Sequence, residues 1–133
     1  MRSLPYWIQR ADFSSAEFEP VDVTGALGAF TMHDWRAELA LLSELEAKGS
    51  ESCPPGIGFV TPNGAILHVC PSSDGRALVH YHAETISKVL GFIPIPRSAI
   101  HTKQGVERSN VLEMIHSFFA ERHDWLLDKL AAA

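Results

Sequence analysis

The sequence predicts a two-layer α+β fold, in which an antiparallel sheet (a three-strand meander plus edge strands) packs against an N-proximal and a C-terminal helix. Two observations about periodicity predict it. Apolar residues recur at helical spacing over residues 32–48 and again from residue 110 onward. Between these two stretches, short apolar runs are separated by turn sequences, which is typical of strands. The short connections require that neighbouring strands run antiparallel.

The first elements of the chain are an expected strand and an expected helix. Residues 17–23 alternate apolar and polar side chains, and Pro20 places this strand at a sheet edge because proline has no amide donor. The helix is predicted over about 32–48 and begins with Thr31 and Asp34 in a pattern like a capping box. Residues at helical spacing, expected on its apolar face, are Trp35, Leu39, Leu41, Leu42 and Leu45.

The meander is predicted over residues 57–60, 65–70 and 77–82. Asn63 and Gly64 form the turn between the first two strands, because both residue types tolerate positive φ. The polar segment 71–75 forms the second turn. Residues 92–96 contain two prolines and are therefore expected to be an edge strand or only a segment that covers the sheet.

The last part of the chain is predicted to be helical. Ser109 or Asn110 is expected to cap this helix. Its apolar face consists of Val111, Leu112, Ile115, Phe118 and Phe119. Beyond it, either Asp124 caps a further helix or the first helix continues, and the spacing fits both alternatives.

The chain has 133 residues, of which 46% are hydrophobic and 20% are charged. This composition predicts one globular domain over residues 1–133. The apolar runs are too short for a membrane span, and the first residues lack the apolar stretch of a signal peptide. We therefore expect a cytoplasmic protein in which Cys53 and Cys70 remain free thiols, with Cys70 as a small buried hydrophobe.

The net charge of −5 arises entirely in the N-terminal part of the chain. Residues 1–52 hold nine Asp and Glu against four Lys and Arg, whereas residues 53–133 hold seven of each. This acidity disfavours nucleic acid as a partner and suits a basic protein, although a solvated acidic surface that only keeps the protein soluble is an equal alternative. The residues expected to contact a partner are Glu17, Glu19, Glu44, Glu46, Asp74, Arg76 and Trp125. Trp125 is expected either in the core or as an exposed anchor.

Histidines are concentrated in the predicted meander. His80 and His82 alternate on one strand and therefore point to the same face of the sheet. If the register places His68 beside them, the three imidazoles and Glu84 form a site for zinc or iron. The alternative is a polar or half-exposed sheet face without a metal. Glu84 follows His82 too closely to match the cupin metal motif.

Motifs for covalent catalysis and phosphate binding are absent from the sequence. The serines cluster in turns, where they form local hydrogen bonds. Gly56 and Gly58 precede a strand rather than a helix, so they lack the helix N-terminus that would hold a phosphate. We expect no catalytic residue and no cofactor.

Three segments and a tryptophan resemble a group of immunity proteins from bacterial polymorphic toxin systems. The segments are 64–69 (Gly-Ala-Ile-Leu-His-Val), 77–82 (Ala-Leu-Val-His-Tyr-His) and 115–120 (Ile-His-Ser-Phe-Phe-Ala), followed by Trp125. The resemblance covers about two thirds of the chain. The chain departs from the pattern in its proline-rich segment 92–96, in the missing Arg-Pro before Trp125 and in its first thirty residues.

The resemblance implies a small α+β protein that occludes the active site of a cognate toxin and has no catalytic residues of its own. We therefore expect a protein-binding module of the immunity or antitoxin-like kind. Two alternatives stay open. One is a metal-binding enzyme or sensor that uses His68, His80 and His82, and the other is a secretion chaperone, adaptor or small-ligand-binding domain.

Overall fold

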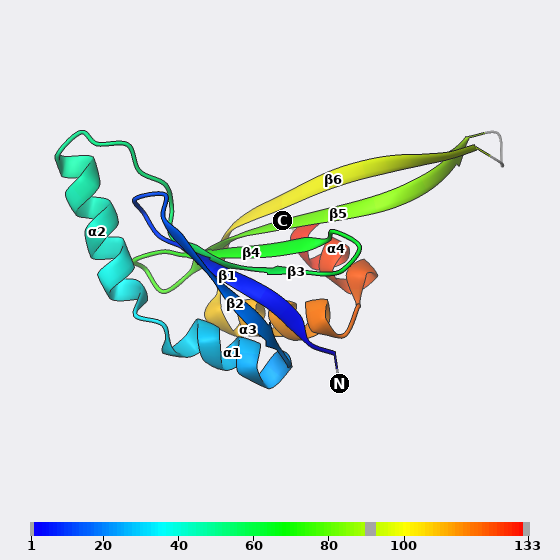
Figure 1. Ribbon diagram of the computed structural model, residues 1–133, viewed down its shortest axis with the longest axis horizontal. Coiled ribbons are helices and arrows are strands. Elements are labelled where there is room, and N and C mark those ends of the chain that lie inside the picture. Colours follow the sequence, from blue (N-terminus) through cyan, green and yellow to red (C-terminus); the bar gives the residue numbers. More distant parts are fainter. Residues whose placement is uncertain (1, 90–92, 132–133) are drawn as a thin grey trace.

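The computed structural model describes residues 2–89 and 93–131, which form a six-stranded sheet and four helices (Figure 1). The strands are β1 (Leu4–Gln9), β2 (Ser15–Val21), β3 (Gly56–Val60), β4 (Ile66–Pro71), β5 (Ala77–Val89) and β6 (Ile93–Val106). The helices are α1 (Val23–Met32), α2 (Trp35–Ala47), α3 (Arg108–Phe119) and α4 (His123–Ala131). The sheet order is β2-β1-β3-β4-β5-β6, and all neighbours are antiparallel. The α+β prediction is confirmed.

The predicted meander is β3, β4 and β5. Gly64 and Gly75 lie in its two turns with φ of 91° and 82°, the left-handed conformation that glycine adopts without strain. β5 continues to Val89 and pairs with β6 along most of its length, so that the two strands extend together beyond the rest of the sheet (Figure 1). Residues 93–96 of the proline-rich segment begin β6, which is an edge strand as expected, while Phe92 lies outside the described residues.

Residues 4–21 form a hairpin that the sequence predicted only in part. β2 is the outermost strand, so the edge position expected for Pro20 is confirmed. The strand ends at Val21 rather than at residue 23, because the Asp22 side chain accepts a hydrogen bond from the Gly25 N–H at 2.8 Å and caps α1. β1 was not predicted. It lies inside the sheet with apolar side chains on both faces, which removes the alternation that reveals a strand.

The predicted helix over about 32–48 is α2, which begins at Trp35, and the preceding helix α1 was not predicted. Asp34 caps α2 by accepting a hydrogen bond from the Ala37 N–H at 3.0 Å, and the chain breaks between α1 and α2 at His33 and Asp34. Thr31 is therefore not a cap. It lies in the last turn of α1, where its hydroxyl donates to the Gly28 carbonyl.

The N-proximal helix of the core is α1, which buries Ala26 and Phe30. We expected the apolar side of α2 to be buried, but its four leucines and Trp35 are only half-buried. The buried residue of this helix is Glu38, which is 4% exposed. The reason is position, since α2 stands beyond the end of the sheet (Figure 1). Glu38 instead accepts hydrogen bonds from Arg10 Nε at 3.0 Å and from His33 Nε2 at 3.2 Å.

The C-terminal region is two helices rather than one. Glu107 is the N-cap residue of α3, so the predicted caps Ser109 and Asn110 lie inside its first turn. The chain then breaks at Glu121, which has a φ of 60°, and α4 begins at His123. Asp124 consequently lies in the first turn of α4 rather than at its cap.

A buried tyrosine joins the sheet to both C-terminal helices. Tyr81 is fully buried, and its hydroxyl lies 2.5 Å from His123 Nδ1 at the start of α4. Its ring stacks on the His123 imidazole and meets Phe118 of α3 edge to face. Burial raises the pKa of Tyr81, so the hydroxyl stays protonated. This contact fixes the position of α4 against the sheet.

Substitution of Tyr81 by phenylalanine should lower the free energy of unfolding by about 1 kcal/mol, because His123 Nδ1 loses its partner while the ring packing is kept. Urea denaturation measures this. Tyr6→Phe is the matched control, since the Tyr6 hydroxyl makes no hydrogen bond among the described residues. Equal effects of both substitutions would contradict a specific role for the Tyr81 hydroxyl.

Candidate functional site

The sheet face opposite the helices carries a continuous row of aromatic and polar residues. α1, α3 and α4 lie on the other side of the sheet (Figure 1). The register places five residues side by side across five strands: Trp7, Gly58, His68, His80 and Thr102. Because side chains alternate along each strand, the neighbouring row, which contains Leu67 and Tyr81, faces the core. His68 and His80 are thus direct cross-strand partners. The expected metal site required this register for these two residues.

Two glycines in β3 make room for this row. A Cβ atom on Gly58 would overlap the Trp7 indole, which lies over the strand. A Cβ atom on Gly56 would lie 2.9 Å from His68 Nε2 and 3.0 Å from Cys70 Sγ. The glycines therefore let the Trp7 ring stack on His68, with centroids 5.8 Å apart and planes 8° apart.

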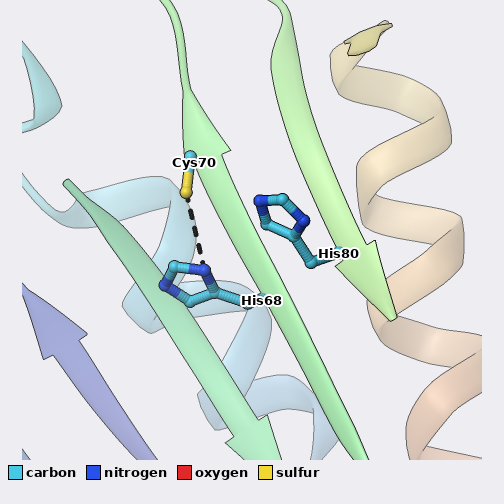
Figure 2. Close-up of side chains that lie close together, drawn as sticks. All are labelled: His68, Cys70 and His80. Atoms are coloured by element: carbon cyan, nitrogen blue, oxygen red, sulfur yellow. Dashed lines mark hydrogen bonds between the residues drawn. The ribbon is translucent and has the colours of Figure 1, made fainter. Parts of the chain in front are cut away.

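His68, Cys70 and His80 form a compact cluster on this face (Figure 2). One ligand atom from each residue can be chosen so that all three atoms lie within 4.8 Å of one another. Cys70 Sγ lies 3.5 Å from His68 Nδ1. His80 Nδ1 lies 3.0 Å from the Thr102 hydroxyl, which holds the imidazole in place from the neighbouring strand. The donor set is two nitrogens and one sulfur.

Burial shifts the pKa values of two residues of this cluster. Burial, with a smaller contribution from the neighbouring His80, lowers the pKa of His68 to about 4. Burial also raises the pKa of the Cys70 thiol to about 11, with a smaller contribution from Cys53. At neutral pH the cluster therefore holds a neutral imidazole at position 68 and a protonated thiol at position 70.

The expected metal ligands are brought together only in part. His82 lies two cross-strand pairs further along, between Ile66 and Ile100, and does not belong to the cluster. Its Nε2 atom is buried and has no hydrogen-bond partner in the described part of the chain. Cys70 takes the third place. Cys70 is 5% exposed, as expected of a buried hydrophobe. Its position two residues after His68 on one strand places both side chains on the same face, and this spacing could have indicated Cys70 as a ligand from the sequence.

The residues expected to bind a partner lie on separate parts of the molecule. Glu17 and Glu19 are exposed on β2, and Glu44 and Glu46 are exposed on α2, where Glu44 pairs with Lys48 at 2.8 Å. The other three residues lie elsewhere: Asp74 and Arg76 in the exposed β4–β5 turn, and Trp125, half-buried, on α4. Because α4 contacts β6 and β2 is the opposite edge strand, these residues do not form one surface.

A pocket of about 320 Å³ lies where α1, α2, α3 and the β4–β5 turn meet. Its apolar wall includes Phe30, Trp35, Leu39 and Val111. Three arginines also line it, Arg36, Arg76 and Arg108, and Arg108 lies over the Phe30 ring at 5.7 Å. Local sequence patterns did not indicate this basic group, because its three arginines lie far apart along the chain.

Comparison with known proteins identifies no relative: no family model, no curated protein and no solved structure matches the chain. Among the described residues, no helix combines the length and the apolar character needed to cross a membrane.

The depressed pKa of His68 predicts a specific pH dependence of stability in metal-free protein. Below its ordinary pKa of 6.5 the unfolded His68 binds a proton, whereas the folded His68 does so only near pH 4. The free energy of unfolding should therefore fall as the pH drops from 6.5 to about 4, by at most about 3 kcal/mol from this residue.

Urea denaturation of wild type and His68→Gln in chelator at several pH values isolates this contribution. The variant should lose less stability over that range than the wild type. His116→Gln, at an exposed histidine of α3, is the control and should follow the wild type. Parallel curves for wild type and His68→Gln would contradict the assignment.

Proposed function

We propose that this protein is a non-catalytic protein-binding module of the immunity or antitoxin-like kind, which inhibits a cognate bacterial toxin in the cytoplasm. The observation that carries the proposal is the outer edge of β2, an exposed acidic strand. The resemblance of residues 64–69, 77–82 and 115–120 to immunity proteins supports the same function. A reducing compartment is consistent with the free thiols of Cys53 and Cys70.

The backbone of β2 supports recognition by strand addition. Within the described residues β2 pairs with β1 alone, and residues 15–20 are all exposed. An edge strand presents unpaired N–H and C=O groups, to which an extended segment of another protein can add as a new strand. Main-chain hydrogen bonds then supply affinity, and the side chains of β2 select the partner.

The charges of β2 favour a basic partner. Glu17 and Glu19 are both exposed on β2 and Glu17 points to the face opposite Phe18, so the strand carries negative charge. Its pairing with β1 shifts register between Phe18 and Val21. Like charges on a second copy of β2 would oppose self-pairing, whereas lysine or arginine on the added strand would be attracted. The edge is thereby protected against aggregation and selective for a basic segment.

An apolar anchor point lies on the other face of the same strand. Phe18 is 40% exposed and stacks on Tyr6 with ring centroids 4.7 Å apart. It borders a groove of about 330 Å³ between β2 and the start of α2, which Ala16 and Ala37 also line. A side chain from an added strand can insert here, and such central buried contacts contribute most of the energy of protein interfaces.

The double charge reversal E17K/E19K tests the proposal with the product of the adjacent gene as the binding partner. Calorimetric titration should show a stable wild-type complex that weakens roughly tenfold or more in the variant, because two attractive contacts become repulsive. The wild-type affinity should fall as salt is raised.

E113K/D128K is the matched control, because it changes the charge equally at two exposed residues on α3 and α4 that are not among the expected partner contacts. Its affinity should stay close to that of the wild type. Equal weakening by the two variants would show an unspecific charge effect, and the absence of any complex with the adjacent product would remove the support for an immunity function.

A second candidate function, binding of a small amphipathic anion, is favoured by the convergence of Arg36, Arg76 and Arg108 at one apolar pocket. Arg108 lies in the first turn of α3, where the helix dipole disfavours a cation. An anionic ligand would offset this unfavourable position, and the apolar wall would hold a hydrocarbon or aromatic group.

Titration calorimetry with decanoate and with decanol distinguishes this function. Decanoate should bind the wild type and lose most of its affinity in R76E/R108E, because the carboxylate loses its partners. Decanol, which has the same chain length without a charge, should bind more weakly than decanoate. Equal binding of the two compounds would contradict a role for the arginines.

A further inference from the structure

We propose that His68, Cys70 and His80 bind one divalent transition-metal ion, with zinc as the ion that fits best, in a site that keeps one coordination position open. The site is independent of the β2 edge and adds a function beyond protein binding.

The geometry is close to that of a tetrahedral zinc site. Zinc bonds of about 2.0–2.1 Å to histidine nitrogen and about 2.3 Å to cysteine sulfur place neighbouring ligand atoms roughly 3.3–3.8 Å apart. Cys70 Sγ and His68 Nδ1 already lie 3.5 Å apart, and no pair in the cluster exceeds 4.8 Å. The limit of 4.8 Å exceeds the range for a tetrahedral site by about 1 Å, so closing the site around an ion requires rotation of the side chains.

The ligands lie on two directly paired strands. All three residues lie on β4 and β5, which pair directly at His68 and His80 in the middle of the sheet. Strands hold ligands more accurately than loops do. The absence of a side chain on Gly56 leaves the space between Cys70 and His68 open, since a Cβ atom there would lie within 3.0 Å of both.

The surroundings also resemble those of a metal site. A ligating histidine usually has its second ring nitrogen hydrogen-bonded, which fixes the tautomer, and Thr102 makes such a contact to His80 Nδ1. The Trp7 indole also packs against the His68 ring in a stacked arrangement.

The donor set selects the ion. One thiolate and two imidazoles suit zinc, copper or cobalt and do not suit magnesium or calcium, which prefer oxygen ligands. On binding, the S–H bond of Cys70 breaks, the sulfur bonds to the metal and the proton passes to solvent, while the neutral imidazoles release no proton. Three protein ligands leave a fourth position for water or another small ligand, as in catalytic zinc sites and unlike closed structural sites.

Cobalt(II) titration of untagged, chelator-stripped protein tests the site, because a cobalt–thiolate bond has a charge-transfer band in the near ultraviolet. We expect one equivalent of Co²⁺ to bind, with the visible spectrum of tetrahedral cobalt, and one equivalent of Zn²⁺ to displace it. The absence of stoichiometric binding by the wild type would overturn the proposal.

Variants identify the ligands. Cys70→Ser should abolish the charge-transfer band, and His68→Gln and His80→Gln should each weaken Co²⁺ binding by more than about tenfold, since even groups that only orient a ligand contribute that much. Circular dichroism shows whether each variant folds. If loss of the buried Cys70 thiol prevents folding, the substitution of the half-exposed His80 tests the site instead.

Two matched controls complete the test. Cys53→Ser changes a thiol outside the cluster, whose sulfur donates to the Arg10 carbonyl, and His116→Gln changes an exposed histidine on α3. Both should bind Co²⁺ as the wild type does. A band retained in Cys70→Ser, or lost in Cys53→Ser, would show that the ligand set is wrong.

Discussion

The register of β4 against its two neighbours is the constraint on which both faces of this protein depend. It places Phe59, Leu67 and Tyr81 in one row against the helices and Gly58, His68 and His80 in the next row on the opposite face. A shift of one residue would exchange the faces and put imidazoles into the core. Burial of the apolar row therefore also maintains the geometry of the polar row, and the site needs no separate scaffold.

Two of the candidate binding features lie away from the layer formed by α1, α3 and α4. They are the outer edge of β2 and the cluster around Cys70, whereas the arginine pocket lies where α1, α2 and α3 meet. For β2 this separation has a physical advantage, because substitutions of its exposed side chains leave the apolar packing of the core intact. The Tyr81–His123 contact belongs to the other side, where it joins the sheet to α4.

Much of the fold follows from local patterns. The turn glycines, the alternation in β3 to β5 and the helical spacing of α2 and α3 each depend on residues close together in sequence. Local patterns did not predict the structure correctly where contacts between residues distant in sequence determine it. β1 is apolar on both faces because Gly58 leaves space for Trp7, and α2 has an apolar side that no strand reaches.

The sequence by itself determined the α+β class, the antiparallel meander, the position of Pro20 at an edge and the acidity of the N-terminal part. Only the tertiary structure decided that Cys70 rather than His82 joins His68 and His80, and that three arginines share a pocket. The reason is that backbone preferences and side-chain periodicity act within a few residues, whereas the meeting of ligands from different strands depends on register, which packing across the whole sheet determines.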